Sequence, residues 1–270
     1  MTASLRSCVP LLLAVALVLS GCATPAPAPA PPQPQPPPPV VVKQQEASPK
    51  ERAKLHADLA AGYYERGRMD VALEELGEAV KLDPNEPRIY NLYGLVYGML
   101  GEDAKAEQNF QRALAMAPQN PDFHHNWGWY LCSTGHPREA IAEFEYALRD
   151  PLYKTPEAAM INAGRCSLAL GDLAGADSYF RRAVAVAPNS PQAIYGVALV
   201  SFKLGRPDDA RTWIRRLTQQ PPVPAEALYL AMCIEKKSGD RSAEQSYIAQ
   251  LKNRYPDSAE TKAIPTGACE

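Results

Sequence analysis

The chain shows no excess of positive charge. It carries 28 lysine and arginine residues against 30 aspartate and glutamate residues, a formal net charge of −2 at pH 7. A protein that follows the phosphates of a nucleic acid needs clustered basic side chains and a basic balance. The composition therefore argues against nucleic acid as a partner.

The sequence also lacks the patterns of common catalytic and metal sites. It has only four histidines, and no Cys or His pair has the spacing of a zinc site. His124 and His125 are adjacent, so on a helix they point about 100° apart and cannot bind one ion together. No GxSxG, P-loop or HExxH sequence occurs. The carboxylates are expected on solvated helix faces, and we expect neither catalysis nor a cofactor.

The longest apolar run is too short to cross a membrane. It is the nine-residue stretch LLLAVALVL, Leu11–Leu19, whereas a spanning helix needs about 20 residues. Preceded by Arg6, this run has the form of a signal peptide, which we place at residues 1–21. A periplasmic enzyme would fit such a signal, but the sequence offers no convergent titratable groups for a catalytic cleft.

The apolar run leads into Leu19-Ser20-Gly21-Cys22, which resembles the lipobox of bacterial lipoproteins. The resemblance implies cleavage before Cys22 and lipidation of its thiol, and several acyl chains together give stable anchoring. Ala23 follows where an aspartate would resemble an inner-membrane retention signal, so we expect the periplasmic leaflet of the outer membrane. The alternative is an ordinary signal peptide with a chance cysteine.

Proline is concentrated in one segment, residues 24–42, TPAPAPAPPQPQPPPPVVV. Such a segment has no core to bury and prefers the extended polyproline II conformation. At about 3.1 Å per residue it would reach about 60 Å. We interpret residues 22–47 as a lipidated cysteine followed by a disordered tether; a proline-rich ligand for a recognition domain is the alternative.

The rest of the chain is a repeat with a period of 34 residues. Turn glycines lie at Gly67, Gly101, Gly135, Gly171, Gly205 and Gly239, separated by 34, 34, 36, 34 and 34 residues. A glycine accepts the positive backbone angle that ends one helix and reverses the chain. A small residue follows each one where two helices would cross, at Ala72, Ala106, Ala140, Ala176, Ala210 and Ala243. A proline then closes the unit, at Pro84, Pro118, Pro151, Pro188, Pro222 and Pro256.

Large apolar residues recur between these markers and give each helix an apolar stripe; they are Tyr90, Tyr93, Tyr97, Phe110, Trp127, Phe144, Phe180 and Ile214. A 34-residue unit of this kind resembles the tetratricopeptide repeat. Because one unit cannot bury its own apolar face, the resemblance implies an all-α fold, a right-handed α-solenoid of six stacked helix-turn-helix repeats. We place them in residues 48–257, at about 53–86, 87–120, 121–156, 157–190, 191–224 and 225–257.

The connection after the third repeat is two residues longer than the period allows. There the chain reads ALRDPLYKTPEAAMINAGRC, with NWGWYLC upstream. Together with the lipobox and the six repeats, this resembles the PilW/PilF family of type IV pilus biogenesis lipoproteins. The resemblance implies a pilotin, which binds the secretin subunit PilQ and promotes its outer-membrane localisation and multimerisation, and hence twitching motility. The alternative is an outer-membrane tetratricopeptide adaptor that recruits cell-wall enzymes.

The first helix of each repeat is expected to line a concave groove for a protein partner. Counted from Pro87 or Pro121 as position one, groove positions are two, five, six, nine, twelve and thirteen. The candidates are Tyr64, Asn91, Leu95, Met99, His125, Asn126, Trp129, Asn162, Arg165, Tyr195, Leu199 and Phe202.

Two sets of these groove candidates leave alternatives open. Asn126 and Asn162 share one phase, so their amides could clamp an extended partner backbone or bond between helices. Trp129 and Phe202 could anchor a partner or pack against neighbouring helices. Arg165 alone does not make the Lys/Arg clamp that a free C-terminal carboxylate requires.

Besides the lipidated Cys22, four cysteines remain in the predicted mature chain, in an oxidising compartment where disulfides persist. Cys132 and Cys166 fall on the first helices of adjacent repeats, which predicts a disulfide with a Cα separation below about 7 Å; two buried free thiols are the alternative. Cys233 is expected in the core and Cys269 unpaired, in a flexible tail at residues 258–270.

This tail is expected to be too short for a capping helix. The second helix of repeat six would then be its own polar cap, with Lys252, Asn253 and Arg254 exposed.

Overall fold

The computed structural model describes residues 47–219, 221–267 and 269. The predicted signal peptide, Cys22 and the proline-rich segment lie outside these described residues. The described part belongs to one compact unit, which begins at residue 46. Within it the secondary structure is helical, with thirteen α-helices, one short 3₁₀ helix and no strand.

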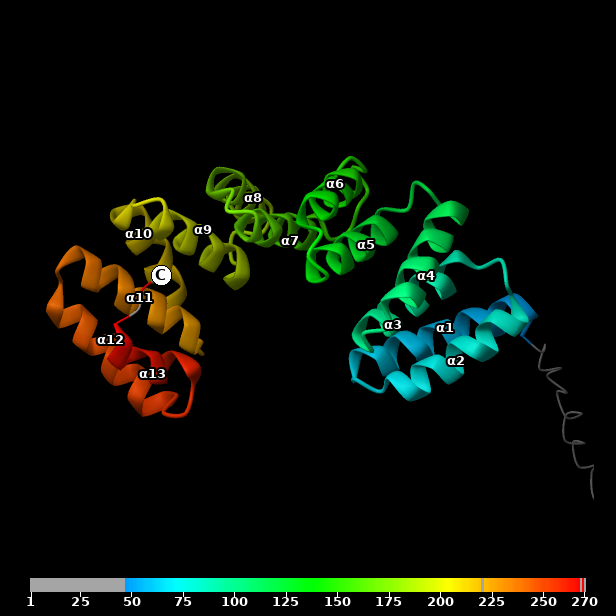
Figure 1. The fold of residues 1–270 in the computed structure, drawn as a ribbon, viewed down its shortest axis with the longest axis horizontal. Coiled ribbons are helices and arrows are strands. Elements are labelled where there is room, and N and C mark those ends of the chain that lie inside the picture. Colours follow the sequence, from blue (N-terminus) through cyan, green and yellow to red (C-terminus); the bar gives the residue numbers. More distant parts are fainter. Residues whose placement is uncertain (1–46, 220, 268, 270) are drawn as a thin grey trace, which may run out of the picture. The chain divides into compact units, whose positions relative to one another are not determined.

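The first twelve helices form six antiparallel hairpins in chain order (Figure 1). They are α1 (Pro49–Glu65) with α2 (Met69–Leu82), α3 (Pro87–Met99) with α4 (Asp103–Met116), α5 (Pro121–Ser133) with α6 (Pro137–Ala147), α7 (Pro156–Ala169) with α8 (Leu173–Val186), α9 (Pro191–Lys203) with α10 (Pro207–Thr218), and α11 (Ala225–Ser238) with α12 (Arg241–Arg254).

The ends of these helices follow from the local sequence. Gly67, in the first turn, has φ 74°, and the five equivalent turn glycines also have positive φ, a conformation that costs glycine little. Proline opens many helices, where its missing N–H is not needed. Ser48 caps α1: its hydroxyl accepts a hydrogen bond from the Glu51 backbone, and the Glu51 carboxylate accepts one from the Ser48 backbone.

In hairpins two, three and four, a glycine on the first helix faces a phenylalanine on the second. The Cα of Gly94 on α3 lies so close to the Phe110 ring on α4 that an added Cβ would be 2.7 Å from it. Gly164 on α7 meets Phe180 on α8 in the same way. The predicted crossing alanines from Ala72 to Ala210 are fully buried, whereas Ala243 in the last hairpin is only half-buried. The repeat pattern is therefore a packing pattern.

The hairpins also stack on one another. Each second helix packs against the first helix of the next hairpin, and α1, α3, α5, α7, α9 and α11 contact each other in turn. No two of the second helices approach as closely within the described residues. The odd-numbered helices therefore lie on the tighter, inner side of the stack, as the tetratricopeptide reading predicts.

Three contacts hold the long connection between α6 and α7 and the two hairpins that it joins. Tyr153 from this connection is 7% exposed and packs among the residues of hairpins three and four. Cys132 on α5 and Cys166 on α7 form the predicted disulfide, with Cα atoms 5.9 Å apart. Arg182 on α8 donates to Glu145 on α6 at 2.9 Å.

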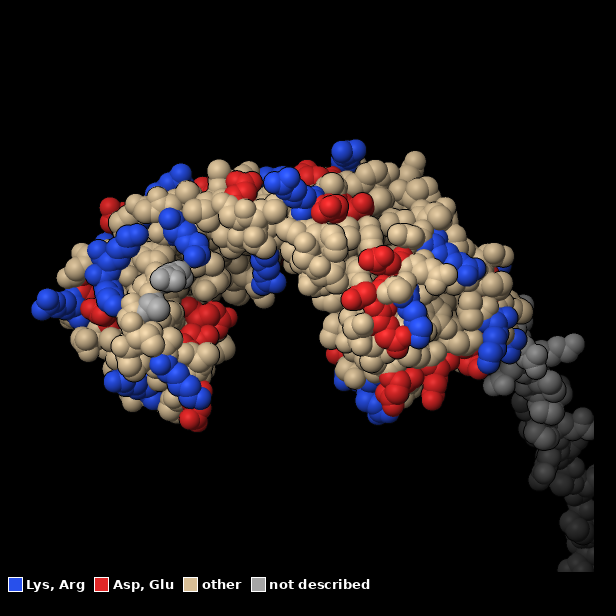
Figure 2. Space-filling model, in the orientation of Figure 1, with Lys and Arg blue, Asp and Glu red and all other residues tan. Residues whose placement is uncertain are grey.

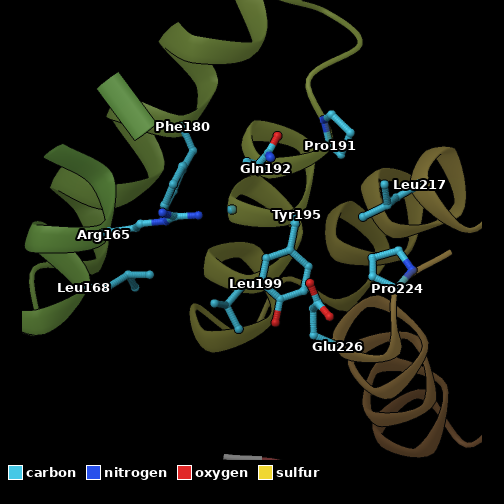
Figure 3. Close-up of a pocket in the computed structure, with 11 residues that line it drawn as sticks. Arg165, Leu168, Phe180, Pro191, Gln192, Tyr195, Leu199, Leu217, Pro224 and Glu226 are labelled. Atoms are coloured by element: carbon cyan, nitrogen blue, oxygen red, sulfur yellow. The ribbon is translucent and has the colours of Figure 1, made fainter. Parts of the chain in front are cut away.

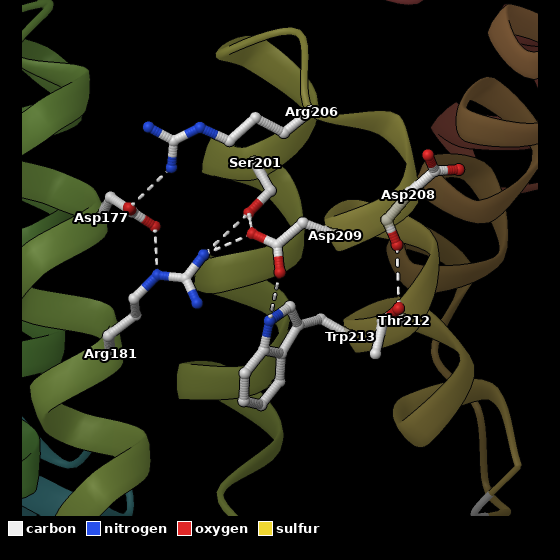
Figure 4. Close-up of polar contacts among 8 residues, drawn as sticks. All are labelled: Asp177, Arg181, Ser201, Arg206, Asp208, Asp209, Thr212 and Trp213. Atoms are coloured by element: carbon white, nitrogen blue, oxygen red, sulfur yellow. Dashed lines mark hydrogen bonds and ion pairs between the residues drawn. The ribbon is translucent and has the colours of Figure 1, made fainter.

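Hairpins four and five are joined by a polar network on α8, α9 and α10 (Figure 4). Arg181 donates to Asp177 at 2.9 Å and also pairs with Asp209, which accepts from Ser201 at 2.8 Å and from the Trp213 indole at 3.0 Å. Burial acts to raise the pKa of Asp209, but these partners outweigh it and lower the pKa. The carboxylate is thus kept charged where the two hairpins meet.

The C-terminal tail differs from the prediction. Residues Ala259–Ala263 form α13, and Ile264–Thr266 form a 3₁₀ helix, η1. Ser258 caps α13 by accepting from the Thr261 backbone, and Lys236 on α11 donates to the Gly267 carbonyl at 3.1 Å. The expectation of a flexible tail too short for a helix is therefore wrong, because polar contacts and packing against α11 order it.

The expectation that Cys269 is unpaired is also wrong. Cys233 is buried on α11, as expected, and it forms a disulfide with Cys269, with Cα atoms 5.4 Å apart. The tail lies against α11, which brings the two cysteines together. The predicted polar face of α12 is present, with Lys252, Asn253 and Arg254 exposed.

Two glycine substitutions test whether close helix crossings hold the hairpins. Gly94→Ala should destabilise the protein by about 1–3 kcal/mol, because its methyl group would overlap Phe110. Gly77→Ala, inside α2 with no atom within 4 Å of the added Cβ, should stabilise it by about 0.5–1 kcal/mol through helix propensity. Urea-denaturation midpoints measure both. Shifts of the same sign would contradict the packing argument.

Candidate functional site

Three large hollows lie along the inner face of the described stack. The N-terminal hollow, about 520 Å³, lies between α3, α5 and the long connection. The central hollow, about 470 Å³, lies over the first half of α7. The C-terminal pocket, about 360 Å³, lies between α7, α9 and α11. The hollows follow one another along the odd-numbered helices, so together they form the candidate binding groove.

The C-terminal pocket has apolar walls and a polar rim (Figure 3). Its walls come from Leu168, Phe180, Pro191, Tyr195, Gly196, Leu199, Leu217 and Pro224. Its rim carries Arg165, Gln192 and Glu226, which are all exposed. An apolar cavity with a few polar groups at its edge suits an apolar group whose neighbours are polar.

The apolar walls are fixed from behind by the hairpin packing. Phe180 is 2% exposed and lies between two glycines, Gly164 of its own hairpin and Gly196 of the next. Tyr195 stands in the pocket beside Leu199, with Glu226 close to it in Figure 3. Burial, and then the charge of Glu226, raise the pKa of Tyr195, so its hydroxyl stays neutral.

The long connection forms a wall between the N-terminal and central hollows. Thr155 and Ala158 line both of them, Tyr153 lines the first, and Lys154 lines the second. The longer connection therefore contributes directly to the lining of the groove. The sequence predicted the extra length of this connection and a disulfide beside it, but not that the connection lines the groove.

His125 holds this connection in place. The Tyr153 hydroxyl lies 2.6 Å from His125 Nδ1, and the Asn162 amide nitrogen lies 3.3 Å from Nε2. An amide nitrogen can only donate, so Nε2 accepts, and Nδ1 carries the proton of the neutral ring and donates to Tyr153. Burial lowers the pKa of His125, which favours this neutral form.

The adjacent His124 has hydrogen-bond acceptors at both ring nitrogens, and these favour its protonated form. Its Nδ1 faces the Glu143 carboxylate, and its Nε2 lies 2.9 Å from the Pro118 carbonyl oxygen. Both partners are acceptors, so both ring nitrogens can donate when the ring is protonated. Burial acts to lower the pKa of His124, but Glu143 and the Pro118 carbonyl outweigh it and raise the pKa.

The asparagine pair bonds between helices. Asn126 on α5 donates to Asn91 Oδ1 on α3 at 3.3 Å, and Asn162 on α7 contacts His125. Of the two alternatives for Asn126 and Asn162, the structure therefore shows the interhelical bonds. Asn91 is 4% exposed, so its amide acts within the stack, although it borders the N-terminal hollow.

The remaining groove candidates divide into three groups. Leu95 borders the N-terminal hollow, and Arg165, Tyr195 and Leu199 border the C-terminal pocket. Trp129 is half-buried beside a small hollow of about 170 Å³ next to the Cys132–Cys166 disulfide. Tyr64 is half-buried and packs against the core of the first two hairpins, and Met99, 53% exposed, borders none of the three hollows.

Phe202 is not a partner anchor. It is 6% exposed, packs in the C-terminal core, and has Lys237 of α11 5.0 Å from its ring centre. Its phase on α9 is that of a groove residue, but α11 covers it.

Position two of five of the six repeats contributes residues beyond the predicted candidates. Helices α3, α5, α7, α9 and α11 place them along the hollows: Arg88, Asp122, Ala158, Gln192 and Glu226. The rule for groove positions includes position two, so these residues could have been predicted from the repeat.

On the face drawn in Figure 2, positive and negative side chains are intermixed.

Among the described residues, no group of three His, Cys, Asp or Glu side chains could hold a metal ion. None of the described helices is both long enough and apolar enough to span a membrane.

The chain resembles known tetratricopeptide and pilus proteins. Family profiles described as tetratricopeptide repeats match residues 62–101, 87–120, 125–191 and 167–232. The type IV pilus assembly protein PilF of Pseudomonas aeruginosa is 26% identical over 153 residues, which cover 57% of this chain and 61% of PilF. The chain thus spans about three fifths of this curated relative.

Two solved structures match over nearly their whole length. The crystal structure of PilW, a widely conserved type IV pilus biogenesis factor, has a TM-score of 0.73 and 29% identity, covering 79% of this chain and 98% of PilW. The structure of Pseudomonas aeruginosa PilF has a TM-score of 0.73 and 26% identity, covering 82% of this chain and 99% of PilF.

The two adjacent histidines should give opposite pH dependences. The lowered pKa of His125 means that the unfolded chain binds its proton first, so its contribution to stability falls as pH drops below about 6.5. The raised pKa of His124 means that its contribution is full below about 6.5 and is lost as pH rises through the native value.

Urea denaturation at pH 5 and pH 8 checks this. His125→Gln should be less costly at pH 5 than at pH 8, and His124→Gln should be more costly at pH 5. Equal costs at both pH values for either variant would refute the assignment of that ring.

Proposed function

We propose that this chain, which belongs to the PilW/PilF family of tetratricopeptide-repeat proteins, serves type IV pilus biogenesis by binding the secretin subunit PilQ. In this proposal it is a pilotin that promotes the outer-membrane localisation and multimerisation of PilQ. The observation that carries it is the match to the PilW structure, at 29% identity over 98% of that chain.

The site supports a binding role in place of catalysis. The groove combines apolar walls with separated polar groups, and its hydrogen-bonded residues, such as His125 and Asn126, are bonded to neighbouring helices. A catalytic site needs titratable groups that converge on one reacting atom. The C-terminal pocket offers one cation and one carboxylate at its rim, Arg165 and Glu226. A stack of rigid hairpins with a lined groove suits recognition of a protein segment.

A lipid anchor completes the proposal. The lipobox Leu19–Cys22 supports attachment to the periplasmic leaflet of the outer membrane, and residues 24–42 would let the solenoid stand away from the lipid surface. A scaffold placed there meets PilQ at the membrane in which the secretin must assemble.

Deletion of the gene should remove the PilQ multimers from membranes and abolish twitching. Gels of membrane fractions probed for PilQ, with complementation by the intact gene, measure this. Normal multimers in the deletion strain would refute the pilotin proposal. Normal twitching together with cell-shape defects would point instead to an adaptor for cell-wall enzymes.

Cys22→Ser should release the protein from membranes, because no thiol remains to be acylated. Fractionation should then find it outside the outer membrane, and metabolic palmitate labelling should disappear while the folded repeats keep their circular dichroism. Cys8→Ser, in the predicted signal peptide, is the matched control and should leave labelling unchanged. Outer-membrane attachment and labelling that persist in Cys22→Ser would disprove the anchor.

A further inference from the structure

We infer that the C-terminal pocket recognises a partner segment in which one apolar side chain stands between an acidic and a basic residue. The apolar side chain enters the pocket, the acidic side chain pairs with Arg165, and the basic side chain pairs with Glu226. The inference deepens the proposed function and rests on it, since it assumes that the groove holds a protein partner.

The pocket is sized and lined for an apolar side chain. Its volume of about 360 Å³ is near the lower end of the range of ligand pockets, about 300–1,000 Å³. Leu168, Tyr195 and Leu199 come from two neighbouring helices and face the same space (Figure 3). These walls are set by core packing, so the pocket exists before a partner arrives and costs little to organise.

Arg165 differs from four neighbouring arginines of hairpins four and five, which are held in ion pairs. Arg181, Arg182, Arg206 and Arg211 pair with carboxylates of adjacent helices. Arg165 is exposed and has no ion pair with any described residue, yet it borders the C-terminal pocket, the central hollow and the small hollow beside the disulfide.

A partner segment bound in the groove would displace the water that solvates the Arg165 guanidinium. Such a group then needs an acceptor, and a carboxylate satisfies it best. A single arginine without a companion lysine suits a side-chain carboxylate inside a segment more than a free C-terminus.

Glu226 gives the segment its direction. It opens the first turn of α11, across the pocket from Arg165, with Tyr195 and Leu199 between them (Figure 3). The two charges are thus on opposite rims of one apolar pocket. A segment with the acid and the base exchanged would meet like charges at both rims, which is disfavoured.

Selection from a random peptide library on phage tests the inference. The full chain is the bait, alongside Arg165→Glu, Arg165→Gln, Glu226→Lys and the control Arg138→Glu, an exposed arginine of α6 that lines none of the hollows. Melting curves must match the wild type before selection. The native protein should enrich peptides with a large apolar residue between an acid and a base.

Each pocket variant should change the peptide preference that depends on the substituted residue. Arg165→Glu should bind the enriched peptide at least about tenfold more weakly, Arg165→Gln should lose only the acid preference, and Glu226→Lys should lose only the basic one. Arg138→Glu should match the wild type. No enrichment, enriched peptides without an acid, or equal binding by Arg165→Glu would overturn the inference.

A parallel pull-down of PilQ separates this inference from the proposed function. Peptide preferences as stated, with no PilQ recovered by the native protein, would keep the pocket assignment and remove the secretin as its partner. PilQ recovered equally by native protein and Arg165→Glu would keep the proposed function and overturn the pocket assignment.

Discussion

The structure depends on the close approach of two helices within each hairpin. A helix of 11 to 17 residues cannot bury an apolar stripe by itself, so the stripe must be covered by a partner helix. Glycine or alanine on one helix lets a large side chain of the other, such as Phe110 or Phe180, reach the helix backbone. The same crossings leave one side of each hairpin apolar, and that side is covered by the next hairpin. Hairpins that are consecutive in sequence are therefore neighbours in the stack.

The candidate site follows from this constraint. Since the odd-numbered helices occupy the inner side, their exposed positions fall in line, and the hollows lie between neighbouring members of this row. Where the period lengthens, after hairpin three, the chain adds a buried tyrosine, a disulfide and the hydrogen bonds of His125. These contacts hold hairpin four on hairpin three and fix the wall that divides the groove.

Much of the fold could be predicted from the repeat. Spacing alone locates six hairpins, the turn glycines and the buried alanines, and the phases of Cys132 and Cys166 predict their disulfide. Exposure was harder to predict. Phe202 has a groove phase, but the last hairpin crowds α9 and covers it. Asn91 also has a groove phase, but it is 4% exposed and accepts a hydrogen bond from Asn126 on α5. Phase gives the direction of a side chain, and the neighbouring helix decides whether it reaches the surface.

The tail shows another limit of sequence reasoning. Its sequence has no strong helical pattern and no period to follow, and α13 is only five residues long. Such a helix forms because of its tertiary contacts, here with α11 and α12 and through the Cys233–Cys269 disulfide. The structure of the tail therefore depends on contacts with the last hairpin that are distant in sequence, and these contacts have no pattern in the local sequence.

Amide hydrogen exchange of the full chain, with and without purified PilQ, tests most directly the claim that the inner face is the binding face. The account predicts that PilQ slows exchange in α7, in α9 and in the connection that carries Tyr153, and leaves α6, α8 and α10 unchanged. Protection confined to α6, α8 and α10, or no protection at all, would contradict it.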